Sequence, residues 1–273
     1  TPNTGYTANG VAQAGNHRYL FTDHGGYILN DQFIATQEIF PNPVATFQTR
    51  EDTLIVFSDY VYFLIHEGDS IRTEKSQYPI WNPEVSIDVG SFIIFGGHMG
   101  ARVLRTLDGQ FGQYVDGLPN TGSGFDVRGY ALSNDTLFAS QSKAIYYCKL
   151  GEYQWKPLPL DLPFDQPGTS IGQFRISGQN MMVAINTSYQ SPETSKYDCR
   201  LYYSNDRGQH FTPWSPEFPT KSTGFVDHDS NYFWAVSGSG ILKKGYADTI
   251  WQPFNAGLKS LAVNFLSVVD GKM

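Results

Sequence analysis

The stretch Leu54-Ile55-Val56-Phe57-Ser58-Asp59-Tyr60-Val61-Tyr62-Phe63-Leu64 contains the pattern that decides the fold. Two apolar runs flank a short polar turn, and each run is too short for a helix and rich in β-branched and aromatic residues. Such runs are typical of two strands joined by a tight turn. Similar pairs of runs begin at Tyr19, Phe92, Leu137, Met181 and Tyr232.

The spacing between these copies is roughly 35 to 50 residues, which is the period of a four-stranded propeller blade. We therefore expect an all-β fold, a β-propeller of four-stranded antiparallel blades with six visible repeats. The paired runs are the second and third strands of each blade. First strands are expected at 44–48, 84–88, 127–132, 173–177, 223–227 and 262–268. A β-sandwich is the alternative, but it does not require one pattern to recur at this period.

The whole chain, 1–273, is expected to form one propeller domain. Residues 266–273 match the first strand and turn that open each earlier repeat, and two interpretations follow. The chain is a fragment of a seven-bladed ring, lacking the rest of its last blade and any C-terminal sorting segment. Alternatively, 262–273 supply an inner strand to the first blade and close six blades, which would remove an exposed sheet edge. Residues 10–15 already resemble that inner strand, which favours the fragment.

Composition and charge exclude several partners. The net charge is −7 and the 19 Lys and Arg residues are scattered, so no nucleic-acid partner is expected. No apolar stretch approaches the roughly 20 residues of a membrane span. The polar start, Thr1 to Gly5, resembles a processed N-terminus and predicts a secreted, extracellular or cell-surface protein. Cys148 and Cys199 are either two buried thiols, which we favour, or a disulfide.

One local motif is specific: Ser204-Asn205-Asp206-Arg207-Gly208-Gln209-His210-Phe211 fits the pattern Ser-x-Asp-x-Gly-x-x-aromatic. Here the Asp accepts hydrogen bonds in a hairpin turn, the Gly allows an unusual backbone angle, and the aromatic packs the hairpin onto its blade. The expected structural residues are Ser204, Asp206, Gly208 and Phe211, with a weaker copy at Asp108, Gly109 and Phe111.

This motif resembles the Asp-box (BNR) repeat β-propeller family of the sialidase-like superfamily, and the chain is similar to secreted Bacteroidetes-type members. The resemblance implies a propeller fold in which Asp-box turns are structural and lie opposite the usual ligand face. It does not imply a particular chemistry.

No residue is singled out as catalytic, and no cofactor or metal is predicted. A sialidase-like site needs three arginines around a carboxylate, and Phe174-Arg175-Ile176-Ser177 lacks the family's Pro and lies in mid-chain. Arg175 is instead read as part of an inner strand. Another glycosidase would need two carboxylates at a suitable separation, which the sequence does not identify. His24 and His98 occupy equivalent turns, too far apart for one metal.

The loops between second and third strands, and those between blades, share one face on which propellers usually bind ligands. The longest such insertion runs from Asn186 to Asp198. Exposed aromatic side chains can stack on sugars or anchor proteins. The candidate binding residues are Tyr78, Trp81, Tyr189, Tyr197, His24 and His98. We therefore expect a secreted module that binds a glycan or protein partner, the alternative being a glycoside hydrolase.

Four Asp-Ser/Thr-apolar triplets match an O-glycosylation acceptor pattern used by Bacteroidetes-like bacteria. The acceptor residues would be Thr53, Ser70, Thr136 and Thr249. A turn followed by a strand favours the same triplets, so both interpretations stay open.

Overall fold

The computed structural model describes most of the chain. The described residues are 8–50, 52–76, 80, 83–90, 92–97, 101–105, 111–113, 117–119, 126–152, 154–165, 167–190, 195–213, 226–229, 231–237, 240–248 and 250–257. They belong to two compact units. The first comprises Thr1–Val115 and Pro119–Val127, and the second comprises Asp116–Leu118 and Arg128–Met273.

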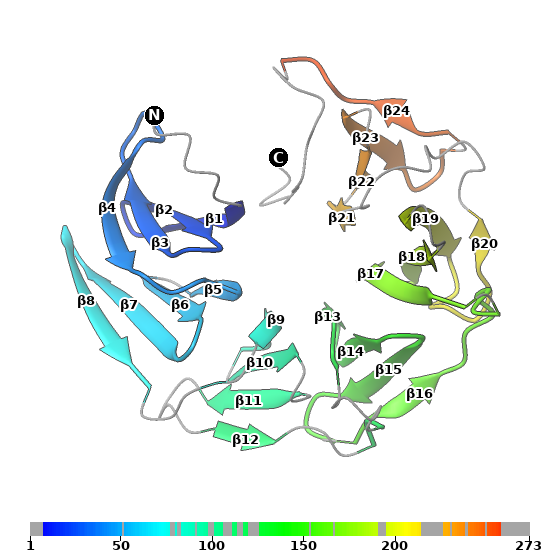
Figure 1. The fold of residues 1–273 in the computed structure, drawn as a ribbon. Helices are drawn as coiled ribbons and strands as arrows, with labels where there is room; N and C mark the ends of the chain where they lie inside the picture. Colours follow the sequence, from blue (N-terminus) through cyan, green and yellow to red (C-terminus); the bar gives the residue numbers. More distant parts are fainter. Residues whose placement is uncertain are drawn as a thin grey trace. The chain divides into compact units, whose positions relative to one another are not determined.

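The first unit contains three four-stranded antiparallel sheets, each following chain order (Figure 1). The first sheet has β1 (Ala8–Ala14), β2 (His17–Thr22), β3 (Gly26–Leu29) and β4 (Ala35–Phe40). The second has β5 (Thr46–Arg50), β6 (Thr53–Phe57), β7 (Val61–Glu67) and β8 (Ser70–Lys75). The third has β9 (Pro83–Asp88), β10 (Phe92–Gly97), β11 (Arg102–Arg105) and β12 (Phe111–Gln113).

The second unit contains three sheets of the same kind. The fourth sheet has β13 (Gly129–Ser133), β14 (Thr136–Gln141), β15 (Ala144–Lys149) and β16 (Lys156–Leu158). The fifth has β17 (Thr169–Ser177), β18 (Asn180–Gln190), β19 (Ser195–Ser204) and β20 (Thr212–Pro213). The sixth has β21 (Val226–His228), β22 (Tyr232–Ser237), β23 (Gly240–Gly245) and β24 (Gln252–Pro253).

The chain's up-and-down course divides its turns between two sides of each unit. Turns joining second to third strands lie on the same side as the connections between sheets, and we call this the loop side. Turns joining first to second and third to fourth strands lie on the opposite, hairpin side. Within each unit, the first strands of neighbouring sheets contact one another, as for β1 with β5 and β17 with β21 (Figure 1).

The prediction of a long loop from Asn186 to Asp198 was wrong. Strand β18 extends to Gln190 and strand β19 begins at Ser195. Tyr189 pairs with Lys196 in an unbroken antiparallel register. Thr187, Tyr189 and Tyr197 belong to residue types that favour strands, so the pairing extends past the expected turn. The remaining second and third strands lie close to their predicted positions.

The core is built by second strands that are buried on both faces. In β6, Leu54 and Val56 pack into the cluster that contains Phe21 of the first sheet. The alternate residues Ile55 and Phe57 pack against the third sheet. This two-sided burial explains why the second strands read as continuous apolar runs.

The fifth sheet repeats this arrangement in the second unit, because Val183 of β18 packs towards the fourth sheet and Ala184 towards the sixth. Cys148 and Cys199 are both buried and form no disulfide, as the sequence favoured.

A buried polar pair lies inside the first unit. The Tyr19 hydroxyl, which is fully buried, donates to His66 Nε2, and His66 Nδ1 lies 2.7 Å from the Asp52 carbonyl oxygen. Since a carbonyl can only accept, the imidazole carries its proton on Nδ1 and accepts at Nε2. Burial raises the pKa of Tyr19 to about 12, so the phenol stays a donor.

Replacing Tyr19 by Phe removes this donor and leaves His66 Nε2 unsatisfied inside the core. We expect Tyr19→Phe to lower the free energy of unfolding by about 1–3 kcal/mol, measured by urea denaturation. Tyr147→Phe is the control, because the Tyr147 ring packs on Phe138 while its hydroxyl bonds no described side chain. Equal stability of the two variants would contradict the assigned role of the Tyr19 hydroxyl.

Candidate functional site

The connection between the first and second sheets, residues 41–45, is held at both ends on the loop side of the first unit. Val44 N donates to the Thr22 carbonyl at 3.2 Å, which ties the connection to the turn of the first sheet. Asn42 Nδ2 donates to Asp59 Oδ2 at 3.0 Å, and Ser58 Oγ donates to the Pro43 carbonyl at 2.6 Å. Two turns and one connection are therefore fixed together.

Asp59, Tyr60, Tyr62 and Lys75 form a group beside this connection, which we call the Lys75–tyrosine group. Lys75 pairs directly with Tyr62 across β7 and β8, and Tyr60 lies two residues before Tyr62, so the three side chains share one face. Lys75 Nζ lies 3.4 Å from the centroid of the Tyr60 ring and 5.9 Å from that of Tyr62. Asp59 and Lys75 are exposed and both tyrosines are half-buried.

The carboxylate of Asp59 is occupied by neutral donors. Its Oδ1 accepts from the Tyr62 hydroxyl at 2.9 Å and its Oδ2 from Asn42. Burial, followed by the hydrogen bond to Asp59, raises the pKa of Tyr62 to about 12, so this hydroxyl remains a donor. The Tyr62 ring also stacks on Phe40 of the first sheet, at 5.4 Å between centroids.

Of the binding residues predicted from sequence, His24 is described with its side chain. It is exposed on the loop side, and its Nδ1 lies 2.8 Å from Asp23 Oδ1. The turn is closed by Thr22 Oγ1, which accepts from the amides of His24 and Gly25 at 3.1 Å each. A side chain at Gly25 would meet the Phe40 carbonyl at 2.6 Å, so the turn packs directly against the connection.

The other predicted binding residues are not placed as side chains. Tyr78, Trp81 and His98 lie outside the described residues. Tyr189 and Tyr197 lie on strands β18 and β19 instead of in a loop, and only their backbone is described.

Sequence reasoning missed the Lys75–tyrosine group. The spacing of Tyr60 and Tyr62 after the turn at Ser58-Asp59 was a visible signal, since residues two apart on a strand share a face. The partnership with Lys75 depends on strand register, which the sequence pattern does not reveal.

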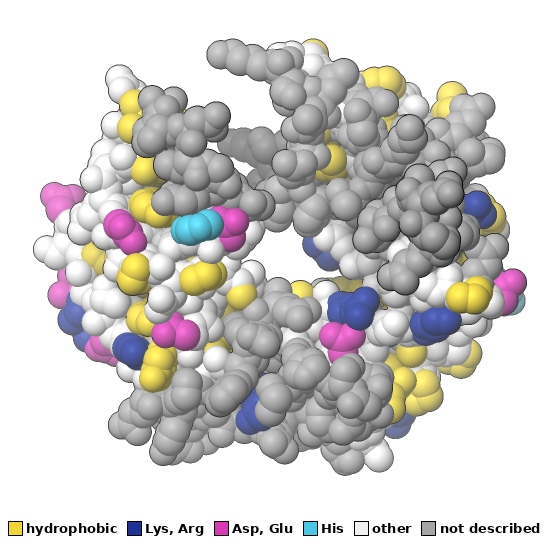
Figure 2. Space-filling view, in the orientation of Figure 1, with side chains coloured by type: hydrophobic (Ala, Val, Ile, Leu, Met, Phe, Trp, Pro, Cys, Tyr) yellow, Lys and Arg dark blue, Asp and Glu magenta, His cyan; other side chains and the backbone are white. Residues whose placement is uncertain are grey.

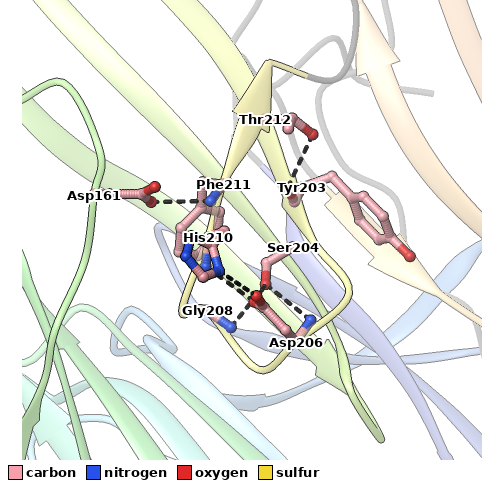
Figure 3. A network of polar contacts seen from close by, with 8 residues as sticks. All are labelled: Asp161, Tyr203, Ser204, Asp206, Gly208, His210, Phe211 and Thr212. Carbon is pink, nitrogen blue, oxygen red and sulfur yellow. Dashed lines mark hydrogen bonds and ion pairs between the residues drawn. The ribbon is translucent and has the colours of Figure 1, made fainter.

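The turn Ser204–Phe211 on the hairpin side of the fifth sheet is a closed polar network (Figure 3). Ser204 Oγ donates to Asp206 Oδ1 at 2.6 Å and accepts from Gly208 N at 2.8 Å. Asp206 accepts from His210 N at 3.0 Å, and Asp206 Oδ2 lies 2.6 Å from His210 Nδ1. Gly208 adopts a φ of 87° that favours glycine, and Phe211 is buried in the core cluster.

This network is structural in its geometry. The aspartate lies between the serine and the histidine, and the serine hydrogen is used by the aspartate, so the histidine does not act on the serine as a base. Asp161, in the connection before the fifth sheet, accepts from the Phe211 amide at 2.9 Å and ties the turn to that connection (Figure 3). In the second copy of the motif, Asp108 and Gly109 lie outside the described residues, and Phe111 begins β12.

Two arginines on first strands are each engaged by an aspartate. Arg50 of β5 forms a two-pronged contact with Asp88 of β9, with Nε 2.8 Å from Oδ2. Arg175 of β17 lies 3.6 Å from Asp227 of β21 and donates to the Phe174 carbonyl at 2.9 Å. A ligand carboxylate at Arg175 would have to compete with Asp227.

Three of the candidate O-glycosylation residues, Thr53, Ser70 and Thr136, begin strands β6, β8 and β14 on the hairpin side. Thr53 and Thr136 are half-buried and Ser70 is exposed, while Thr249 lies outside the described residues. Thr136 Oγ1 donates to Asp135 at 3.1 Å, which is the local turn chemistry that favours the same triplet.

The surface in Figure 2 shows charged side chains of both signs interspersed with hydrophobic ones over the described residues. Among those residues, no group of three or more His, Cys, Asp or Glu side chains is arranged to hold a metal ion. The described part of the chain also has no helix with the length and apolar character needed to cross a bilayer.

Comparison with known proteins supports the fold. No family model and no curated protein matches the sequence. The extracellular domain of the putative one-component system BT4673 from B. thetaiotaomicron matches 96% of this chain at TM-score 0.68 and 11% identity. The chain spans only 35% of that structure's length.

Two smaller proteins are matched over most of their length. The match to the Neurospora crassa Pan2 WD40 domain covers 91% of this chain and 79% of the length of that domain's chain, at TM-score 0.61 and 12% identity. The match to YCF48, in a structure bound to D1 peptide, covers 92% of this chain and 86% of the YCF48 chain, at TM-score 0.58 and 10% identity. These likenesses confirm the predicted fold class, a β-propeller-type protein of four-stranded antiparallel blades. The resemblance to the Asp-box family stays a prediction.

The Asp206–His210 pair makes the stability of the Ser204–Phe211 turn depend on pH. Hydrogen bonds from Ser204 and His210 hold the pKa of Asp206 well below its usual range, and Asp206 raises the pKa of His210. The contribution of Asp206 is lost as pH falls through its folded pKa, and that of His210 is lost as pH rises through its folded pKa. The pair therefore stabilises the turn most between the ordinary pKa values of Asp and His.

We expect His210→Ala to lower the melting temperature more at about pH 5.5 than at about pH 9, because the pair is ionised in full only at the lower value. The variant keeps the backbone bond from residue 210 to Asp206, so it tests the side chain alone. In an Asp206→Asn background the pH dependence of this effect should disappear. An equal loss at both pH values would show that the ion pair does not contribute.

Proposed function

We propose that this chain is a secreted or cell-surface binding module that uses the loop side of its first unit to bind a protein partner. The observation that carries the proposal is the Lys75–tyrosine group, an accessible set of aromatic and charged side chains held by two turns and a connection. Tyrosines in such settings are frequent anchors of protein interfaces. One of the structures with a similar fold is an extracellular domain, which supports the extracellular setting of this proposal.

The arrangement of the rings favours a protein over a glycan. A sugar ring stacks on an open aromatic face, but one face of Tyr60 is covered by Lys75 and one face of Tyr62 by Phe40. The covered faces reduce the ring area available for stacking, and the site also offers hydroxyl groups, ring edges and an ammonium, which suit the mixed polar and apolar surface of a peptide. The structure of YCF48 with a D1 peptide shows that a protein of similar fold binds a peptide.

A glycoside hydrolase is the alternative. It would need a pair of carboxylates that act on a glycosidic bond. On the first strands, Asp88 and Asp227 are each paired with an arginine. That pairing favours a structural role for both, and a glycan hydrolysis screen would test it, since turnover abolished by Asp88→Asn or Asp227→Asn would support the hydrolase.

The binding proposal predicts that Tyr60→Ala weakens peptide binding. Peptides selected from a display library on the full chain should lose on the order of tenfold or more in affinity for this variant, because the ring supplies buried contact area. Fluorescence polarisation with the selected peptides measures the loss. The variant should keep its thermal melt, because Tyr60 lies in a half-exposed turn.

Tyr232→Ala is the matched control for this experiment. Tyr232 also lies under a lysine, with Lys243 Nζ 5.0 Å from its ring centroid, but it lies in the second unit beside a hairpin-side turn. It should leave peptide affinity unchanged. Selection of no peptide, or binding of glycans in place of peptides, would contradict the proposal.

A further inference from the structure

We propose that the Lys75–tyrosine group binds a carboxylate of the protein partner, with Lys75 Nζ as hydrogen-bond donor and counter-charge. This inference rests on the proposed function and specifies the chemistry of its ligand. The carboxylate can come from an Asp or Glu side chain or from a C-terminus.

The first step is the charge state of the site. Lys75 Nζ rests on the Tyr60 ring, and in the described part of the chain no carboxylate lies within ion-pair distance of it. A cation–π contact orients an ammonium without neutralising it, so its remaining N–H groups stay available to an anion. The neighbouring carboxylate of Asp59 is satisfied by Tyr62 and Asn42 and does not require a cation.

A comparison within β8 shows that this arrangement is particular to Lys75. Arg72, three residues earlier on the same strand, forms ion pairs with Glu67 and Glu74. Its charge is neutralised by the chain's own side chains. Lys75, at the loop-side end of the strand, is supported by aromatic rings in place of carboxylates.

The second step is preorganisation. The Ser76 amide donates to the Val61 carbonyl at 2.9 Å and the Val61 amide to Ser76 Oγ at 3.2 Å, which fixes the end of β8 against β7. The Ile80 amide donates to the Asp59 carbonyl at 2.9 Å and holds the turn. A lysine placed in advance loses less conformational freedom when a carboxylate binds.

The third step concerns selectivity. The chain carries a net charge of −7, so its overall field does not attract acidic peptides. A measured preference for carboxylates must therefore come from a short-range contact. Lys75, placed on tyrosines that also contact the partner, supplies that contact.

The test uses two arrays of random peptides that are matched one to one and differ only in their carboxylates. One carries Asp, Glu and a free C-terminus, and the other carries Asn, Gln and a C-terminal amide at the same positions. The wild-type chain should bind its preferred acidic peptides on the order of fivefold or more above their amide counterparts. Lys75→Met should remove this difference, and Lys75→Arg should retain it.

The control is Lys243→Met, which removes the lysine over Tyr232 and should leave the acidic preference unchanged. Lys75→Glu should reverse the preference towards Lys- and Arg-containing peptides. Single acidic positions and the C-terminus are then amidated one at a time to identify the carboxylate used. Lys75 is exposed, so these variants should melt like the wild type.

The outcomes separate the two proposals. If acid and amide peptides bind equally while Tyr60→Ala still weakens both, the carboxylate inference is wrong and the binding function stands. An acidic preference that persists in Lys75→Met also overturns the inference. If no peptide of either array binds, the proposed function fails and the inference fails with it.

Discussion

Face-to-face packing of consecutive four-stranded sheets is the constraint on which the rest of each unit depends. A sheet that lies between two others must bury both faces, so its second strand becomes apolar at every position, as in Leu54 to Phe57. This continuous burial is the source of the repeated pattern in the sequence. Polar groups inside the packed sheets need a partner there, as in the Tyr19–His66 pair, whereas the polar groups of turns and connections can also face solvent.

The candidate site follows from this division. Tyr62 belongs to the packed structure through Phe40 and to the surface through Asp59. Its ring is thus anchored between the first two sheets, while its hydroxyl organises the turn. Lys75 lies beside Tyr62 on the exposed edge strand because the strand register makes it the cross-strand partner of Tyr62. A half-buried ring packed against the core and an exposed cation are therefore joined within one strand pair.

The fold could be predicted from sequence because a strand buried on both faces is apolar at consecutive positions, and these short apolar runs recur at the period of the sheets. The second and third strands, and first strands such as β9, lie close to the predicted ranges. The site could be predicted only in part. His24 was identified because it lies in a recognisable turn, whereas Lys75 is an ordinary surface lysine until the β7–β8 register places it on Tyr60. Tyr189 and Tyr197 were predicted to lie in a loop because polar residues between them suggested a long turn. In the structure the backbones of β18 and β19 stay paired past these residues.

The connection at 41–45 has a consequence for how such chains diverge. It is bonded to the turn of one sheet through Val44 and to the turn of the next through Asn42, so its length is set by the gap between them. An insertion or deletion there would pull both turns out of place. Gly68, by contrast, sits in a hairpin-side turn with open space around it. Variation in length among descendants of this sequence should therefore accumulate at open hairpin-side turns such as that of Gly68, where added residues can extend into solvent.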